Sequence, residues 1–230
     1  MKYFKIGLRT YFELDRVPSR ANGDNVPNAD TLFRKMKDGE KFNLPVLDYF
    51  FLQSFDKKEF WEWILCDVYS FTHNAGWIRG WFISDDLKLL LENFNLSNPY
   101  GFYPSKLLYK GKKIDYYVFQ FTGDLTYKQT LDYINYPASI FLNPETNTEI
   151  IVSNKDNFLS EWDKVYKENK SLAKTIRFKK LILKEQLDFF PIGTIMKDNI
   201  VSERLKNAIE ENSIEGFEFS ELDYEVVVEK

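Results

Sequence analysis

The segment SERLKNAIEENSIEGFEFSELDY, residues 202–224, repeats in outline a segment that lies much earlier in the chain. Residues 84–109 read SDDLKLLLENFNLSNPYGFYPSKLLY. Each copy begins with a serine and an acid, continues with Leu-Lys, and reaches a Gly-Phe pair, at residues 101–102 and 216–217. Ser, Leu and Tyr then follow at similar offsets. We therefore predict two similar units, each made of a capped helix, a glycine and a strand.

The first part of each copy has the pattern of a short helix. Ser84 and Ser202 are good N-caps, because a serine hydroxyl accepts a hydrogen bond from a free amide of the first turn. The helix dipole favours the acids that follow, Asp85 and Asp86 in one copy and Glu203 in the other. Apolar residues then recur at the i, i+3, i+4 spacing of one helix face: Leu87, Leu90, Leu91 and Phe94, and Leu205, Ala208 and Ile209. Helices this short need to dock on a sheet.

The strand of each copy changes its apolar phase. Phe102 occupies an even position, whereas Leu107 and Tyr109 occupy odd ones. Alternate residues of a strand point to opposite faces, so this change predicts a bulge or a bend. We place the bend near Ser105 in the first copy and near Ser220 in the second.

The rest of the chain predicts an α+β fold with mostly antiparallel sheets and a few short helices. A turn at KGKK joins residues 107–109 to 114–121 as a hairpin. Further strands are predicted at residues 2–14, 59–71, 133–142, 148–152 and 175–187. Helices are predicted at residues 28–37 and 155–173. Residues 18–27 and 189–199 are predicted to be irregular. The chain is expected to form one domain, 1–230, or two packed lobes, a strand-rich 1–75 and a 76–230 part that contains both units.

Composition narrows the classes of function. The chain has 230 residues, of which 44% are hydrophobic and 17% aromatic, which is ample for a core. Its formal charge is −4, whereas a nucleic-acid binder usually carries a basic stripe, so no nucleic-acid partner is expected. The sequence shows no signal peptide and no apolar run of about 20 residues. With a single cysteine, Cys66, and no disulfide, these features predict a cytoplasmic protein without a membrane span.

The sequence offers no recognisable catalytic, cofactor or metal site. His73 is the only histidine, which excludes a His-based zinc site, and its Gly-rich surroundings favour a surface loop. Cys66 is expected to be a buried apolar residue. Phosphate-binding glycine motifs are absent, and the acids at 85–86 suit a helix start. We therefore expect no enzyme, while an enzyme based on carboxylates stays open as an alternative.

A partner-binding surface is the remaining candidate. Trp77 and Trp81 flank Arg79 near two glycines, where we expect both tryptophans to be exposed. Tryptophan and arginine are enriched at binding hot spots. Together with the nearby acids Asp85 and Asp86, these residues are the predicted partner-binding face.

Three segments carry a resemblance to a known family: WFISDDLKLLLENFNL (81–96), LLYKGKKIDYYVFQF (107–121) and IVSERLKNAIEENSIEGFEF (200–219). They resemble the immunity proteins of bacterial polymorphic toxin systems, in particular the group called immunity family eleven. The resemblance covers residues 77–219. It implies a cytoplasmic protein that binds a cognate toxin domain and occludes its active site without catalysis. A partner-binding or regulatory domain that has no toxin partner is the alternative, and the oligomeric state stays open.

Overall fold

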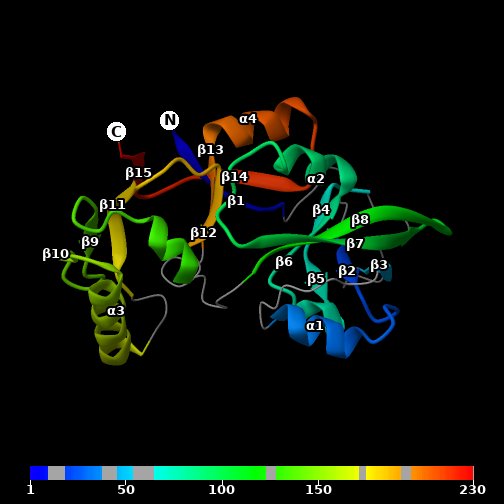
Figure 1. Ribbon diagram of the computed structural model, residues 1–230, viewed down its shortest axis with the longest axis horizontal. Coiled ribbons are helices and arrows are strands. Elements are labelled where there is room, and N and C mark those ends of the chain that lie inside the picture. Colours follow the sequence, from blue (N-terminus) through cyan, green and yellow to red (C-terminus); the bar gives the residue numbers. More distant parts are fainter. Residues whose placement is uncertain are drawn as a thin grey trace.

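The computed structural model describes residues 1–9, 19–37, 46–53, 65–122, 128–170, 175–192 and 198–229. Within them the protein has the predicted α+β architecture, with mostly antiparallel strand pairs (Figure 1). The helices are α1 (Ala29–Lys37), α2 (Asp85–Leu91), α3 (Lys155–Asn169) and α4 (Glu203–Glu211), with short 3₁₀ helices η2 (His73–Trp77) and η3 (Lys128–Tyr133). The predicted helices at 28–37 and 155–173 are therefore confirmed.

The strands in the described parts of the chain form three sheets. In sheet order, the first consists of β4 (Val68–Tyr69), β6 (Gly80–Ser84), β8 (Lys112–Phe121), β7 (Tyr100–Tyr109), β3 (Leu47–Gln53), β2 (Arg20–Asn22) and β5 (Phe71–Thr72). The second consists of β12 (Phe189–Ile192), β13 (Asp198–Ser202), β1 (Tyr3–Leu8) and β14 (Phe217–Glu221). The third consists of β10 (Glu149–Ile150), β9 (Ile140–Leu142), β11 (Arg177–Leu183) and β15 (Glu225–Val228).

Two groups of four strands have the same arrangement. One group is β4-β6-β8-β7 in the first sheet, and the other is the whole second sheet, β12-β13-β1-β14. In each group a helix follows the second strand and leads to the fourth, α2 after β6 and α4 after β13. The third strand of each group comes from a different place along the chain. β8 follows β7 directly, whereas β1 comes from the far end of the chain. The two units are therefore circularly permuted copies of one arrangement.

Strand registers show which residues are equivalent. Tyr116 on β8 lies opposite Ser84, and Tyr3 on β1 lies opposite Ser202. Both tyrosines are buried, at 4% exposure. Tyr3 and Tyr116 therefore occupy the same position in the two units.

The same registers correct the alignment of the Gly-Phe pairs. Three residues after each equivalent tyrosine lie Ile6 and Phe119, which pair with Phe219 and Phe102. The structural counterpart of Phe102 is therefore Phe219 rather than Phe217. The sequence alignment is misplaced because the segment between helix and strand is shorter in the second unit. The two Gly-Phe pairs therefore lie two positions apart in the structural alignment.

Each unit begins its helix with a serine cap. The Ser84 hydroxyl accepts a hydrogen bond from the amide of Leu87, and the Ser202 hydroxyl accepts one from Leu205, both at 3.2 Å. Each serine hydroxyl also donates to an aspartate, over 2.6 Å in both units. These caps satisfy amide groups that a helix start would otherwise leave without partners.

The two aspartates connect the units to each other. Asp67 precedes β4 and Asp188 precedes β12, and each binds the cap serine of its own unit. The second carboxylate oxygen of Asp67 accepts from the amide of Glu215, which follows α4, over 2.7 Å. The second oxygen of Asp188 accepts from the amide of Asn95, which follows α2, over 3.0 Å. Each carboxylate thus binds its own helix start and the loop after the other unit's helix.

A shared apolar core lies between the units. Trp81 of β6 stacks on Phe189 of β12, with ring centroids 5.3 Å apart, and meets Phe217 edge-on. Each sheet packs its other face in a separate core, one under α1 and one with the third sheet and α3. Both faces of the strands in the two units are therefore covered.

Strands that are buried on both faces explain why some predictions are wrong. The register of β7 with β8 runs without interruption from Tyr100 to Tyr109, so the bend expected near Ser105 is absent. Even residues such as Phe102 pack towards the core between the units, and odd ones such as Leu107 face α1. In the second copy the apolar phase changes after Glu221, where β14 ends and the chain passes to the third sheet.

Two segments that looked irregular hold strands. β2 lies inside predicted loop 18–27 and pairs with β3 and β5, and β12 lies inside 189–199. Short strands that depend on partners far along the chain carry weak local signals. The hairpin across KGKK is confirmed and is longer than predicted. Of the strand predicted at 59–71, residues 59–64 fall outside the described part of the chain.

We predict that Asp188→Asn lowers the free energy of unfolding by about 2–4 kcal/mol at neutral pH. Asp188 is fully buried. Burial opposes its ionisation, but hydrogen bonds from Arg204, Ser202 and the Asn95 amide outweigh that and lower its pKa. A lowered folded-state pKa stabilises the protein above the unfolded carboxyl's pKa of about 3.9, and the stabilisation is lost as the pH falls towards the folded value.

Urea unfolding of the wild type and the variant from pH 7 down to pH 3 measures this difference. The gap between the two proteins should shrink below about pH 4. Glu218→Gln, which removes an exposed acid from β14, is the control and should change little. A gap of constant size across this pH range would contradict the prediction.

Candidate functional site

The predicted partner-binding residues lie around β6 and α2. Asp85 and Asp86 are exposed in the first turn of α2, and Arg79 is exposed just before β6. Trp77 ends η2, and its side chain falls outside the described part of the structure. Arg79 and Asp85 lie at opposite ends of β6, separated by six strand steps or about 20 Å.

The expectation that Trp81 is exposed is wrong. Its side chain is 9% exposed and packs in the core between the units. Besides Phe189 and Phe217, it meets Phe119 at 6.4 Å. The alternation of β6 explains this position, because Trp81 and Ile83 share the face that turns to the second unit. Trp81 is therefore a packing residue.

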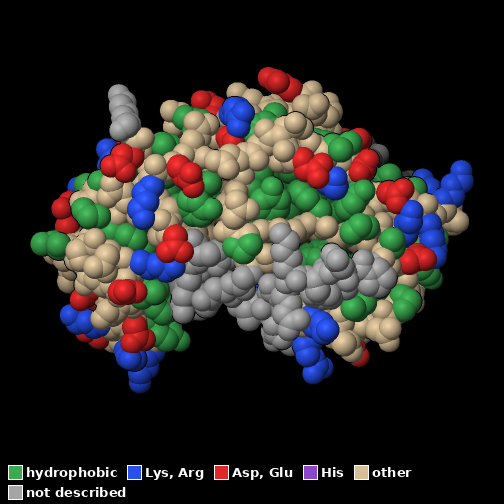
Figure 2. Space-filling model, viewed as in Figure 1, with side chains coloured by type: hydrophobic (Ala, Val, Ile, Leu, Met, Phe, Trp, Pro, Cys, Tyr) green, Lys and Arg blue, Asp and Glu red, His purple; other side chains and the backbone are tan. Residues whose placement is uncertain are grey.

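The structure brings the acids of α2 together with those of α4. The two helices contact each other along the upper edge of the molecule in Figure 1. Acidic side chains gather along that edge in Figure 2. We call this surface the two-helix face and define it by its exposed acids and its exposed leucine, which are Asp85, Asp86, Leu89, Glu92, Glu203, Glu210 and Glu211.

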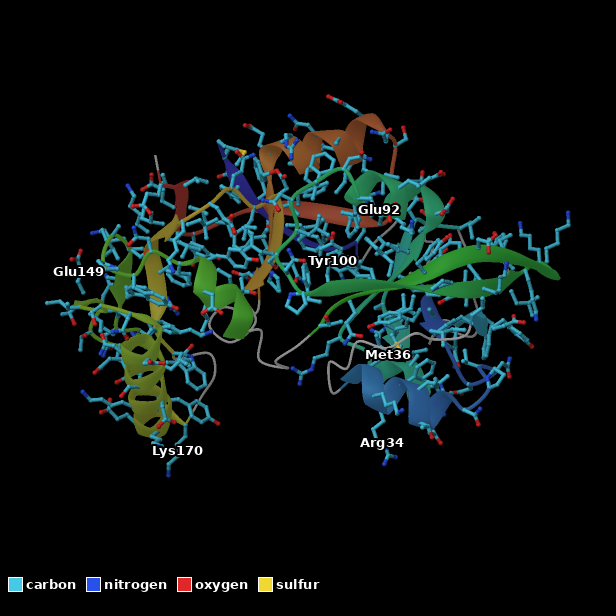
Figure 3. All side chains as sticks on the ribbon, viewed as in Figure 1. Arg34, Met36, Glu92, Tyr100, Glu149 and Lys170 are labelled. Atoms are coloured by element: carbon cyan, nitrogen blue, oxygen red, sulfur yellow. The ribbon has the colours of Figure 1, made fainter. Side chains whose placement is uncertain are left out.

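Lysines at equivalent positions of the two helices are held by their own helix and sheet. Lys88 pairs with Glu92 at 2.9 Å, and Lys206 pairs with Glu210 at 2.7 Å. Each lysine also lies over two aromatic rings of its sheet. The Glu92 side of α2 and the rings beneath it, including Tyr100, are seen in Figure 3. These contacts neutralise both lysines and keep them close to the protein surface.

The third base of the two helices is also engaged. Arg204 binds both carboxylate oxygens of buried Asp188 and lies 4.6 Å from the ring centre of Phe94. The three bases Lys88, Arg204 and Lys206 are therefore all paired. Asp86, Glu203 and Glu211 have no ion pair within the described residues, so the two-helix face carries unbalanced negative charge.

Asp85 lies near Tyr117 of β8. Burial, followed by the charge of Asp85, raises the pKa of Tyr117, so the phenol stays protonated beside the carboxylate.

An exposed leucine lies among these acids. Leu89 is 50% exposed. On a helix its neighbours are the residues three and four positions away, which here are Asp85, Asp86, Glu92 and Asn93. A single apolar side chain inside a polar ring matches the core-and-rim pattern of protein interfaces.

Sequence reasoning missed five of the seven residues that define the face, which are Leu89, Glu92, Glu203, Glu210 and Glu211. Leu89 was overlooked because α2 has four leucines, and only its position outside the stripe of Leu87, Leu90 and Leu91 marks it as exposed. Glu211 belongs to the site only because α4 lies beside α2. That proximity depends on tertiary structure and leaves no mark in either segment.

The remaining candidates for a chemical role are Cys66 and His73. Cys66 is buried, as predicted, and burial, with the charges of Glu215 and Asp67, raises its thiol pKa to about 12. His73 begins η2, with its Nδ1 atom 3.5 Å from the carboxylate of Asp24 on the protein surface. Among the residues that the structure describes, no three His, Cys, Asp or Glu side chains are grouped to hold a metal ion.

Comparisons with known proteins give no assignment. No family model matches the chain, and no curated protein matches it. Across the described ranges, the structure holds no helix of the length and apolar character that a bilayer crossing requires.

We predict that Trp81→Ala acts on stability. Removing a buried tryptophan from the core between the units should cost about 3–5 kcal/mol of unfolding free energy. Trp81→Phe keeps an aromatic ring beside Phe189 and should cost much less. Thermal or urea unfolding measures both, and equal stability of Trp81→Ala and the wild type would contradict the buried position.

Proposed function

We propose that this chain is an immunity protein that binds a toxin domain through the two-helix face. The observation that carries the proposal is the charge balance of that face. All three of its bases are paired with acids of the same chain, whereas Asp86, Glu203 and Glu211 have no ion pair within the described residues, and Leu89 is exposed beside Asp86. Such a surface complements a basic partner.

The charge of the face defines the class of partner. A domain that cleaves nucleic acid carries a basic groove, because phosphate neutralisation supplies most of its affinity. Carboxylates spread over two adjacent helices would occupy that groove and block its substrate. This mode needs no catalysis by the immunity protein, and electrostatic attraction would speed the encounter.

The resemblance to immunity proteins supports the same reading, since two of its three segments contain the helices of the face. Neutralisation would occur in the cytoplasm, where such a toxin would meet its substrate. The alternative is a regulatory domain that uses the same face for a partner other than a toxin. Binding to the toxin domain encoded beside this chain separates the two proposals.

We predict that Asp86→Lys and Glu211→Lys each weaken binding to that toxin domain at least about tenfold, which corresponds to about 1.4 kcal/mol. Leu89→Ala should weaken it by a similar factor through lost apolar contact. Titration calorimetry with a catalytically inactive toxin domain measures affinity, and growth during co-expression with the active toxin measures protection.

Glu168→Lys is the matched control, because it reverses an exposed charge on α3, away from the face. It should bind like the wild type. All variants alter exposed side chains, so each should unfold near the wild-type temperature. Wild-type affinity in Asp86→Lys, Glu211→Lys and Leu89→Ala would exclude the face, and no binding by the wild type would exclude the immunity function.

A further inference from the structure

A cleft opens where the chain passes from the second sheet to the third. β14 ends at Glu221, and β15 begins at Glu225. The cleft has a volume of about 580 Å³. Its walls are the start of the chain and the last strand, which lie near each other in Figure 1. Its lining includes residues 1–3 on one side and 224–228 on the other, with Glu221 and Leu222 between them.

The cleft runs along the backbone edge of β15. Five consecutive residues, 224–228, line it. Successive side chains of a strand point to opposite faces, so a cleft over one face would meet only every second residue. Contact with all five places the cleft beside the strand. β15 is the edge strand of the third sheet, with β11 on its other side.

Backbone groups of β15 point into the cleft. Glu229 donates its amide to the carbonyl of Leu183, so alternate residues of the strand direct their backbone groups to β11. Val226 and Val228 lie between them in the alternation, and their amide and carbonyl groups point to the open edge. They offer a row of donors and acceptors for another strand.

The hydrogen-bond ladder between β1 and β14 ends at the opposite wall of the cleft. Arg9 donates its amide to the carbonyl of Gly216, so odd-numbered residues of β1 direct their backbone groups to β14. The last pair of that ladder is Phe4 with Glu221. Tyr3 is the next odd residue, and its backbone groups point to the space that β14 has left.

Tyr3 adds a side-chain donor that lacks an acceptor. Its hydroxyl is buried and has no hydrogen-bond partner among the described residues. The equivalent tyrosine of the first unit, Tyr116, donates to the carbonyl of Cys66 over 2.7 Å. Burial, and then the charge of Asp188, raises the pKa of Tyr3 to about 12, so the hydroxyl keeps its proton. A buried unpaired hydroxyl is costly, and this one lies inside the core, so the backbone groups of Tyr3 are what the residue offers to the cleft.

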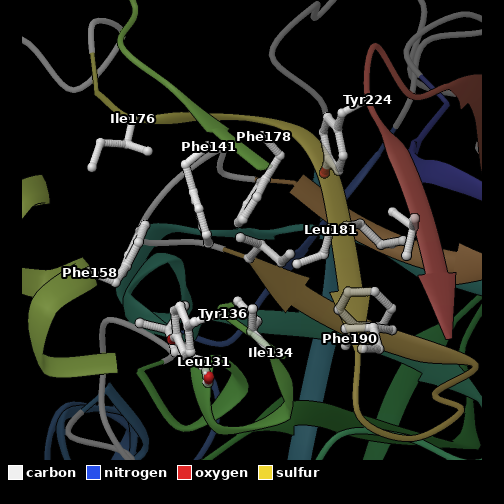
Figure 4. Close-up of a cluster of buried hydrophobic side chains, with 14 of the residues drawn as sticks. Leu131, Ile134, Tyr136, Phe141, Phe158, Ile176, Phe178, Leu181, Phe190 and Tyr224 are labelled. Atoms are coloured by element: carbon white, nitrogen blue, oxygen red, sulfur yellow. Dashed lines mark hydrogen bonds between the residues drawn. The ribbon is translucent and has the colours of Figure 1, made fainter. Parts of the chain in front are cut away.

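The charges at the rim are paired. Lys2 binds Glu221 at 2.6 Å, and Glu225 binds Lys180 at 3.2 Å. An anionic ligand such as a nucleotide needs free cations, whereas a peptide backbone needs alternating donors and acceptors. Below the rim, the ring of Tyr224 packs on Phe178, which anchors the floor in the core (Figure 4).

The size of the cleft fits a short strand. Strand spacing, sheet spacing and rise give about 160 Å³ per residue of a packed strand. The observed volume therefore corresponds to about four residues, the length of β15. We propose that the cleft receives an extended segment of a partner polypeptide, which pairs with the open edge of β15 and meets the free backbone groups of Tyr3 on the opposite wall.

This mode of recognition takes affinity from main-chain hydrogen bonds and specificity from alternate side chains. The cleft shares no residue with the two-helix face, so this proposal does not rest on the immunity function. The two proposals can fail separately.

The first test uses the peptide acetyl-Lys-Val-Thr-Val-Thr-Lys-amide and nuclear magnetic resonance of the full chain. At millimolar peptide we expect the amides of Val226 and Val228 to shift and to become protected from hydrogen exchange. The same peptide N-methylated at every residue cannot pair with a strand and should cause neither change. No change at residues 224–228, or equal changes with both peptides, would overturn the proposal.

Another test removes one backbone amide that points from β15 into the cleft. Val228→Pro deletes the amide that faces the cleft, and an edge position tolerates proline. We expect this variant to lose peptide binding and to keep the wild-type affinity for the toxin domain. Unchanged peptide binding would show that the peptide does not pair with β15.

Discussion

The fold depends on two carboxylates, half-buried Asp67 and fully buried Asp188, that each bind both units. Asp67 and Asp188 receive the hydroxyl of a cap serine with one oxygen and an amide of the opposite unit with the other. A charged acceptor is stabilising only when its hydrogen bonds are complete. Neither helix start can therefore keep its geometry unless the loop after the other helix is in place. This mutual requirement fixes α2 and α4 relative to each other.

The consequence for function is a preformed surface. Residues of the two-helix face come from segments that are far apart in sequence, yet their relative positions are set by the carboxylate ties and by the stack of Trp81 on Phe189. A surface that is rigid before it binds loses little conformational entropy on association. The tie at Asp188 is reinforced by Arg204, whose guanidinium also covers Phe94 between the helices.

Local patterns in the sequence were enough to predict the elements that depend on local interactions. The caps at Ser84 and Ser202 and the apolar stripe behind each cap are short-range features, and so is the turn at KGKK. The predictions failed where distant segments meet. Trp81 looked exposed because its partner Phe189 lies in a segment that appeared irregular, and Pro191 hid the strand β12. Three residues of the two-helix face, Glu203, Glu210 and Glu211, were missed for the same reason, since nothing in α2 indicates that α4 lies beside it.

The permuted order of the second unit constrains how the chain acquires its structure. All strands of the first unit lie between Val68 and Phe121, so it can form from one continuous segment. The second unit needs β1 to find β13 and β14, at the opposite end of the chain. Contacts of such long separation form slowly. On the ribosome the first unit would be complete while Trp81 and Phe119 still faced water. The nascent chain therefore passes through an aggregation-prone intermediate that exposes apolar side chains. The yield of the protein in a cell would depend on chaperones as much as on the stability of the folded protein.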